Sequence, residues 1–183
     1  MNHRLRCCLT GGIACGKSLL SSFLNARGVE TLDADDIVHE LIPLAERRRL
    51  AKEVFADPEK RRALEARIHP LVKERLNQFL SEPPQDGFFM RMAVIPLLFE
   101  CKWDAEYDII VSVISPREEQ IQRMITRRGY TRAEAESRLA AQMDVQEKAR
   151  RSHYTILNEG SVQSLEVAAD RFVAWLKERM TNE

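Results

Sequence analysis

One stretch of the chain restricts its fold more than any other: Leu9 to Ser18, which reads Leu-Thr-Gly-Gly-Ile-Ala-Cys-Gly-Lys-Ser. It matches the pattern G-x-x-x-x-G-K-[ST], the P-loop. Glycine lets the backbone curl without Cβ clashes, so that successive amide groups can point at a chain of phosphates. The residues expected to surround those phosphates are Gly11, Gly12, Ile13, Ala14, Cys15, Gly16, Lys17 and Ser18.

The surroundings of this loop agree with a phosphate site. Residues 5–10 form a short apolar run that predicts a buried strand, and residues 18–26 read as a helix. Because the amino end of a helix carries a partial positive charge, the order strand, loop, helix favours an anion at the loop. Lys17 is expected to reach the β- and γ-phosphates of a nucleotide, and the Ser18 hydroxyl to bind Mg²⁺.

The charge balance excludes some classes of protein. Lys and Arg number 28, and Asp and Glu also number 28, so the formal net charge is zero. Proteins that bind the backbone of nucleic acids depend on excess positive charge, and we therefore expect no nucleic-acid partner. No apolar run is long enough to cross a bilayer, and the first residues do not resemble a signal peptide, so we expect no membrane partner.

The cysteines indicate a reducing compartment. The chain has four of them, with no C-x-x-C pair and no spacing typical of a metal site. This usage predicts a cytoplasmic protein. Cys7 and Cys8 are neighbours in a predicted strand, so we expect their side chains to face opposite ways.

Three carboxylates follow the second predicted strand, residues 29–32. Asp33, Asp35 and Asp36 stand where this strand meets a helix. Asp is favoured at the start of a helix, and Asp36, with or without Asp35, is explained by capping alone. Asp33 is expected at the carboxyl end of the strand, the edge at which open α/β sheets bind ligands.

Residues 44–80 read as helical and densely charged. Asp57 is the expected N-cap of one helix, and His69-Pro70 is expected to begin another. The basic residues 47–49 and the pair Arg61-Arg62 allow two interpretations, an anion-binding face or a solvated helix surface, and the second is the more common.

The next strands are apolar enough to lie inside a parallel sheet. Residues 88–96 form one strand and residues 108–114 another. The first ends without an Asp, so the chain shows no plain Walker B carboxylate, and the next candidate is Glu100. Ser115 is expected to cap the helix that follows the second strand.

An arginine-bearing helical hairpin follows. Gln120, Arg123 and Arg127 lie on its first helix, and a capping box at Thr131 starts the second, which we expect to include Arg138 and Gln142. A hairpin of this kind suggests a lid, at about residues 116–150, that closes over the phosphates. The alternative is a surface hairpin held by ordinary ion pairs.

Strands and helices therefore alternate along the chain, with residues 154–158 as the last strand and 165–180 as the closing helix. This order predicts an α/β fold, a P-loop NTPase-type parallel sheet in three layers with helices on both faces. We expect one domain over residues 1–183, with a helical substrate region at about residues 38–82.

Among P-loop proteins, the small size and the arginine hairpin favour a small-molecule kinase. No Asn-Lys-x-Asp motif is present, which argues against a GTPase. A kinase needs a carboxylate beside the acceptor hydroxyl to orient it and accept its proton, and Asp33 is the best-placed candidate.

Several motifs together resemble the dephospho-CoA kinase family over nearly the whole chain. They are the loop at residues 9–18, Asp33-Ala34-Asp35, His69-Pro70, Pro96-Leu97-Leu98-Phe99-Glu100, Arg138 with Gln142-Met143, and Asn158-x-Gly160. The resemblance implies transfer of the ATP γ-phosphate to the ribose 3′-hydroxyl of dephospho-CoA, the last step of coenzyme A biosynthesis. It also implies a P-loop core, a helical CoA-binding region and a lid.

The resemblance assigns roles to individual residues. The loop, Lys17 and Asn158 hold ATP, Ser18 holds Mg²⁺, and Arg138 comes from the lid. Asp33 is the base toward the 3′-hydroxyl, and Asp35 is a supporting or metal-shell group. His69 and Glu100 lie near the acceptor; their ordinary alternatives are a helix cap and a solvated carboxylate.

Three departures from the family pattern stand out. A helical segment that the family carries between Ile42-Pro43 and residues 46–49 is missing, which bears on the acceptor side. Ser152-His153 replaces Ala-Asp, with a predicted effect on the lid end or nucleotide pocket. Cys15 replaces a small polar residue, and near a helix amino end its thiol is expected to have a lowered pKa and to be open to oxidation.

Two alternatives to this function stay open. One is a kinase for another nucleotide or a small alcohol, and the other is a nucleotide-binding module without catalysis. The sequence leaves the oligomeric state between a monomer and a weak homo-oligomer.

Overall fold

A computed structural model of the protein describes residues 5–43, 46 and 57–181. Five parallel strands form one sheet in the order β2-β3-β1-β4-β5. Their bounds are Cys7–Gly11 for β1, Val29–Asp33 for β2, Met90–Val94 for β3, Ile109–Ile114 for β4 and Tyr154–Leu157 for β5. Because β1 is in the middle, the loop that follows it lies at the centre of the carboxyl edge.

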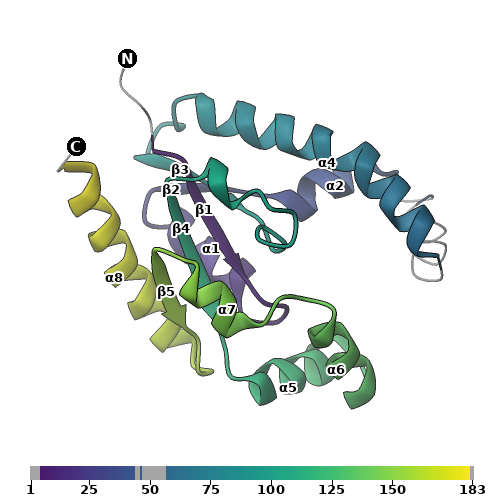
Figure 1. Ribbon diagram of the computed structural model, residues 1–183. Coiled ribbons are helices and arrows are strands. Elements are labelled where there is room, and N and C mark those ends of the chain that lie inside the picture. Colours follow the sequence, from purple (N-terminus) through teal and green to yellow (C-terminus); the bar gives the residue numbers. More distant parts are fainter. Residues whose placement is uncertain (1–4, 44–45, 47–56, 182–183) are drawn as a thin grey trace.

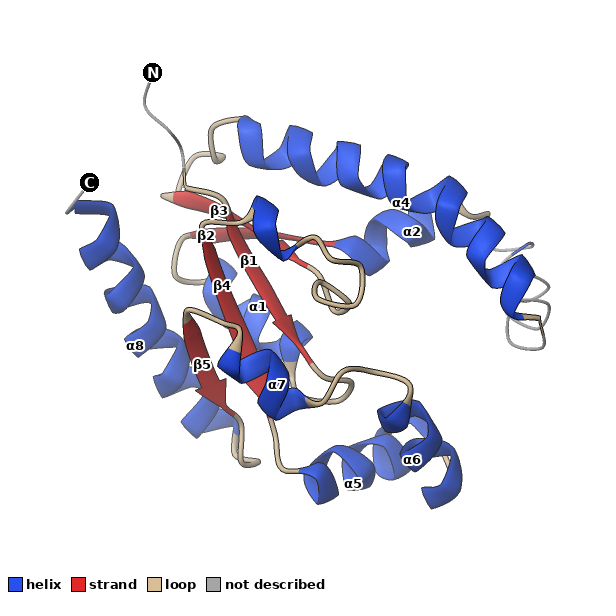
Figure 2. Cartoon of the chain, viewed as in Figure 1, coloured by secondary structure: helices blue, strands red, loops and turns tan. Residues whose placement is uncertain are grey.

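Helices cover both faces of the sheet, which confirms the predicted three-layer α/β fold (Figures 1 and 2). On one face lie α1 (Lys17–Asn25) and α8 (Val162–Thr181), and on the other α2 (Ala34–Leu41) and α4 (Pro58–Ser81). Cys7 and Cys8 are both fully buried, one in each of the two cores, so they face opposite ways as predicted.

The helical region after β2 differs from the prediction at His69. That residue does not begin a helix: α4 starts after its N-cap Asp57 and continues through Pro70 to Ser81. The prediction placed a boundary before the proline because proline lacks an amide N–H and normally interrupts a helix. Residues 47–49 and the start of the charged stretch lie outside the described residues.

Beyond the carboxyl ends of β1 and β4 lies the predicted hairpin, made of α5 (Arg117–Arg128) and α6 (Arg132–Ala140) (Figure 1). The capping box at Thr131 is confirmed. Two local predictions are wrong: Ser115 does not cap α5, because its hydroxyl is bonded to the backbone elsewhere, and α6 ends before Gln142.

The remaining described elements are short. The short helix α7 (Val145–Arg150) packs on β4 and β1, and a single 3₁₀ turn, Asp104–Glu106, precedes β4. Across residues 5–43, 46 and 57–181, we find no helix that is long and apolar enough to span a bilayer.

Candidate active site

The P-loop turns sharply between β1 and α1, and two glycines make the turn possible. Gly11 has φ 146°, and a Cβ added to it would lie 2.2 Å from the carbonyl oxygen of Val113. Gly16 has φ 98° and would place a Cβ 2.5 Å from the Asn158 side chain. Both conformations are ones that other residues rarely adopt, so neither glycine is replaceable without moving the backbone.

Side chains hold the carbonyl groups of this loop one after another. The Lys17 ammonium donates to the oxygens of Gly11 and Gly12, at 3.0 and 2.9 Å. Further bonds are Gln120 Nε2 to Ile13 O at 2.7 Å, Arg123 Nη1 to Ala14 O at 3.1 Å, Asn158 Nδ2 to Cys15 O at 2.9 Å and, more loosely, Ser115 Oγ to Cys15 O at 3.5 Å. These donors define the orientation of the peptide units from residue 11 to residue 15 before any ligand arrives.

Ala14 is held in an unusual conformation. Its φ is 58°, in the left-handed region that non-glycine residues seldom occupy. The guanidinium of Arg123 donates to its carbonyl and also to the Ser115 hydroxyl at 2.8 Å. Ser115 in turn donates to the carbonyl of Asn158 at 2.8 Å. Contacts from two distant elements thus hold this strained turn in place.

A hollow of about 300 Å³ lies in front of the loop. Loop residues, Lys17 and Ser18 line one side, and Pro96 and Gln142 line another. Asp33 and Asp35 complete it together with three arginines of α5: Arg123, Arg127 and Arg128. The structure therefore brings the predicted phosphate loop, the predicted base and a source of positive charge to one cavity.

The ionisation of Asp33 and Lys17 is altered by their surroundings. Burial raises the pKa of the Asp33 carboxyl above its ordinary value of 3.8. The hydrogen bond that it accepts from the Asp35 amide acts in the opposite direction and is outweighed. Burial lowers the pKa of the Lys17 ammonium. A carboxylate whose pKa lies nearer neutrality is a better proton acceptor, so the shift suits a general base.

Asp33 lines the cavity and also caps a helix. It ends β2 beside Val94 of β3, and its side chain accepts from the Asp35 amide at 2.9 Å, which makes it the N-cap of α2. The prediction gave the capping role to Asp36 or Asp35. The cap was misplaced because the strand runs one residue further than the apolar pattern indicated.

Two other predicted residues do not line the cavity. Arg138 belongs to α6, and its guanidinium lies 4.4 Å from the centre of the Tyr130 ring. His69 packs edge-on against the ring of Trp103, 5.4 Å between centroids.

Asn158 and Glu100 act inside the protein. Asn158 is 6% exposed and contacts the back of the loop. Glu100 pairs with the Nζ of Lys148 at 2.9 Å, so it is not the solvated carboxylate that was the ordinary alternative.

Comparison with known proteins decides the family. The sequence model of the dephospho-CoA kinase family matches residues 5–46 and 44–164. The chain belongs to the dephospho-CoA kinase family. A dephospho-CoA kinase from Anaeromyxobacter dehalogenans is 37% identical to it over 191 residues, which cover 92% of this chain and 90% of the relative.

Two solved structures have a similar fold. The crystal structure of TT1252 from Thermus thermophilus has a TM-score of 0.78 and 34% identity, covering 96% of this chain and 99% of that one. The dephospho-CoA kinase from Campylobacter jejuni has a TM-score of 0.69 and 22% identity, with 93% and 96% covered, and supports the fold.

The comparisons also bear on the shortened segment. The match of this kinase to its family model is divided at residues 44–46, close to Ile42. The alignment with the Anaeromyxobacter relative spans 191 positions, more than the 183 residues of this chain. Both observations agree with a segment that relatives carry and this kinase lacks.

The structure bears on two of the departures from the family pattern. Burial raises the pKa of the Cys15 thiol, which is fully buried, so the expected lowered pKa is wrong. The helix amino end was the basis of that prediction, and desolvation outweighs it. Ser152 and His153 lie near the amino ends of the strands, where His153 pairs with Ile110, so they do not belong to the nucleotide cavity.

Sequence reasoning missed three side chains of the site. Gln120 and Lys148 are buried, at 2% and 0% exposure, and Gln142 accepts from the Ile13 amide at 2.9 Å. The sequence analysis placed Gln120 on a helix and named Gln142 as a helix residue and a family motif, without a role in the site for either. A polar side chain on the apolar face of a helix signals an internal partner, but Lys148 stands in a charged run that reads as surface.

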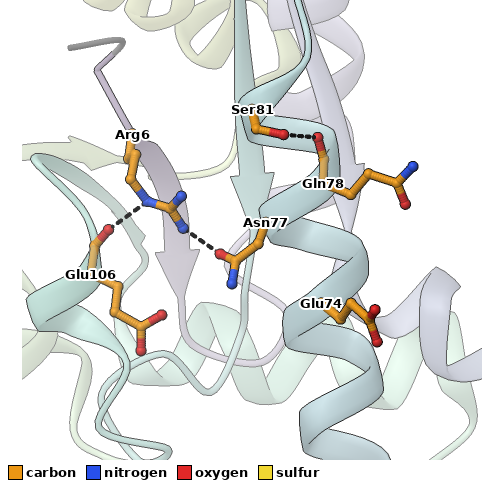
Figure 3. A pocket seen from close by; sticks show the side chains of 6 residues that line it. All are labelled: Arg6, Glu74, Asn77, Gln78, Ser81 and Glu106. Atoms are coloured by element: carbon orange, nitrogen blue, oxygen red, sulfur yellow. Dashed lines mark hydrogen bonds between the residues drawn. The ribbon is translucent and has the colours of Figure 1, made fainter. Parts of the chain in front are cut away.

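A second hollow of this kinase lies away from the P-loop. It measures about 700 Å³ and lies at the amino end of β1, beside the last turns of α4 (Figure 3). Its one arginine, Arg6, is already bonded to the carbonyl of Glu106 and to Asn77. With Glu74 and Glu106 also on its wall, it lacks the positive charge that phosphates need, so we assign the chemistry to the smaller hollow.

The donor set beside the loop suits Mg²⁺. The hydroxyl of Ser18 and the carboxylate of Asp35 line the same cavity, and both offer the hard oxygen ligands that this ion prefers. Among the described residues there is no group of three or more His, Cys, Asp and Glu side chains that would form a complete metal cage. Mg²⁺ commonly takes one or two protein ligands together with phosphates and water, and Ser18 and Asp35 would be such ligands.

Proposed function

We propose that this kinase transfers the γ-phosphate of ATP to the ribose 3′-hydroxyl of dephospho-CoA, the last step of coenzyme A biosynthesis. Family membership supports the reaction. The single structural observation that carries it is that Lys17, the first residue of α1, and Asp33, the last residue of β2, line the same cavity.

The chain's own groups supply the steps of the transfer. The amides of the P-loop and the Lys17 ammonium bind the phosphates, so that the γ-phosphorus faces Asp33. The carboxylate of Asp33 accepts the proton of the 3′-hydroxyl as its oxygen bonds to phosphorus, and the bond from phosphorus to the β–γ bridging oxygen breaks to release ADP. The resulting products are ADP and coenzyme A, with the proton left on Asp33.

We infer that Mg²⁺ takes part, held by Ser18 with Asp35 in support. When bound, it would neutralise charge on the phosphate oxygens. Asp35 is exposed beside Asp33, which suits a group that meets the ion through water.

The lid is proposed to consist of α5 and α6. Arg132 makes a two-pronged ion pair with Glu118, with both distances 2.8 Å, which ties the two helices into one unit. Arg127 and Arg128 already line the cavity, whereas Arg138 would need a movement of α6 to reach it. Since α7 packs on the sheet, we place the moving part before residue 141.

His69 and the helical region at about residues 38–82 are proposed for the acceptor side. The shortened segment after Ile42 favours one further candidate, a kinase for another nucleotide or a small alcohol. A nucleotide-binding module without catalysis is the weaker alternative, because Lys17, Ser18 and Asp33 all face the cavity. A monomer or weak homo-oligomer, a cytoplasmic location and the absence of a nucleic-acid partner stay predictions.

The test is an acceptor-dependent assay. ADP release is measured with ATP and Mg²⁺ in the presence of dephospho-CoA, a nucleoside monophosphate, or shikimate. We expect turnover with dephospho-CoA alone. Turnover with another acceptor would shift the assignment to the second kinase, and ATP binding without turnover for any acceptor would favour the binding module.

A further inference from the structure

An ion pair between Lys148 and Glu100 lies next to the cavity without lining it. Lys148 of α7 is 0% exposed, and its ammonium lies 2.9 Å from Oε1 of Glu100. The same ammonium donates to the carbonyl of Pro96 at 2.8 Å. One cation thus holds both ends of the turn that follows β3, residues 96–100.

The carboxylate of Glu100 has a second task. Its Oε1 accepts a hydrogen bond from the backbone amide of Met143 at 2.9 Å. The neighbouring residue, Gln142, accepts from the amide of Ile13 in the P-loop, also at 2.9 Å. Residues 142–143 are therefore fastened on one side to the phosphate loop and on the other to the turn after β3.

These contacts connect the loop that holds the phosphate donor to the side of the cavity that holds the proposed base. Ile13 belongs to the loop that holds the phosphate donor. Pro96 lines the cavity together with Asp33, the proposed base, and follows the strand that pairs with the strand of Asp33. The distance between donor and base thus depends on the connection Ile13, Gln142, Met143, Glu100, Lys148, Pro96.

We propose that Glu100 and Lys148 are positioning residues that set the distance between the phosphate donor and the acceptor hydroxyl by clamping residues 142–143. This inference rests on the proposed function. It gives Glu100 a role other than the place near the acceptor that the family resemblance implies, because Oε1 already accepts from two internal donors and Oε2 is buried inside the protein. Neither side chain is a lining residue of the cavity.

The experiment compares three single variants. Lys148→Met keeps the length of the side chain and removes both of its bonds, and Glu100→Leu removes the acceptor for Met143. Glu100→Gln keeps an oxygen that can accept from Lys148 and Met143. The matched control is Leu176→Ala, a fully buried core residue of α8, which lowers stability away from the clamp.

Steady-state kinetics give the first readout, measured well below the melting temperature of each variant. We expect Lys148→Met and Glu100→Leu to lower kcat about 100-fold at saturating substrates, the size of loss that a displacement of about 1 Å can produce. The KM for ATP should change little, and Glu100→Gln should restore most of the rate. The double variant Lys148→Met/Glu100→Leu should lose no more than the worse single variant, because the pair acts as one unit.

Amide hydrogen exchange gives a readout that does not depend on turnover. The N–H of Met143 is protected by Glu100, so its exchange should become faster in Lys148→Met and in Glu100→Leu. In Leu176→Ala and Glu100→Gln it should stay slow.

The outcomes are separable. A normal kcat in variants that melt as early as Leu176→Ala would reduce the pair to a structural role. A raised KM for dephospho-CoA with normal kcat would make Glu100 an acceptor contact and overturn the inference. If the unmodified enzyme released no ADP with dephospho-CoA, the proposed acceptor would be wrong, while exchange at Met143 would still decide whether the pair clamps this segment.

Discussion

Asn158 lies 143 positions after Cys15, and its side-chain amide donates to the Cys15 carbonyl at 2.9 Å in the buried back of the P-loop. The Nδ2 atom also stands where a Cβ on Gly16 would have to go. The last strand of the sheet thus delivers the side chain that completes the first loop.

Replacing Asn158 by Asp should weaken ATP binding. The substitution keeps the oxygen that accepts from Gly160 but cannot donate to Cys15, so the buried Cys15 carbonyl loses its closer donor and keeps the longer contact from the Ser115 hydroxyl at 3.5 Å. We expect the free energy of unfolding to fall by about 1–3 kcal/mol and the KM for ATP to rise. Urea unfolding and initial rates measure the two effects; Gln122→Ala, on the exposed face of α5, is the control, and an unchanged KM in Asn158→Asp would contradict the role.

The variant Asp33→Asn should separate catalysis from folding. Loss of the base should lower turnover by about 10²–10⁴-fold while ATP still binds. Asn also caps helices well, so α2 should stay intact. ATP titration and ADP release measure the two properties. Asp36→Asn, an exposed neighbour, is the matched control, and near-normal turnover in Asp33→Asn would exclude it as the base.

The raised pKa of Asp33 makes two pH predictions. As a base it must be ionised, so kcat/KM should fall as the pH drops through a value above 3.8, and this acid limb should disappear in Asp33→Asn. Because folding raises this pKa, stability from the group is present at low pH and is lost as the pH rises through the raised value. The melting temperature of Asp33→Asn near neutral pH should therefore be equal to or above that of the unmodified protein. A clear decrease would show that the charged carboxylate stabilises the fold.

Replacing the individual arginines of the hairpin should lower the reaction rate to different extents. Arg127 and Arg128 line the cavity, so replacing either by Ala should reduce kcat/KM for ATP by about 10²-fold, the cost of removing one charge-stabilising donor. Arg138→Ala tests the closed lid: a loss in kcat of similar size would indicate that α6 moves inward. Arg132→Ala breaks the ion pair between α5 and α6 without removing a cavity residue, and its rate is compared with those of the other variants. Normal rates in all four variants would leave the hairpin as a surface feature.

Cys15 should resist modification in the folded protein. Its thiol is fully buried and its pKa is raised by that burial, so little thiolate forms near neutral pH. Cys101 is partly exposed and should react first. Mass spectrometry after iodoacetamide treatment follows each site. Rapid labelling of Cys15 together with loss of ATP turnover would revive the interpretation of a reactive loop cysteine.

The sheet and the loop could be predicted because their signals are local. The glycine pattern at residues 11–18 and the apolar runs that became β1, β3 and β4 each carry their own information. Pro70 could not be placed in the same way. Local preference ends a helix before proline, whereas α4 is held by packing of Val72, Leu76 and Leu80 against the sheet.

The interior of the site could not be predicted because its contacts span long distances in the chain. Lys148 lies among charged residues and looks like a surface lysine until β3 brings Pro96 and Glu100 to it. The prediction of a lowered pKa for Cys15 was wrong for a related reason. The charge of a helix end was visible in the sequence, but the burial that overrides it was not.

The carbonyl contacts of the loop have a consequence for protein engineering. Three of the side chains that hold residues 13–15 come from positions beyond 119: Gln120, Arg123 and Asn158. A segment cut out at residues 7–25 and grafted onto another strand and helix would carry the motif but leave these partners behind. The short signature by which such enzymes are recognised is therefore not a portable binding module, and a transplant would have to bring a helix and a distant strand end with it.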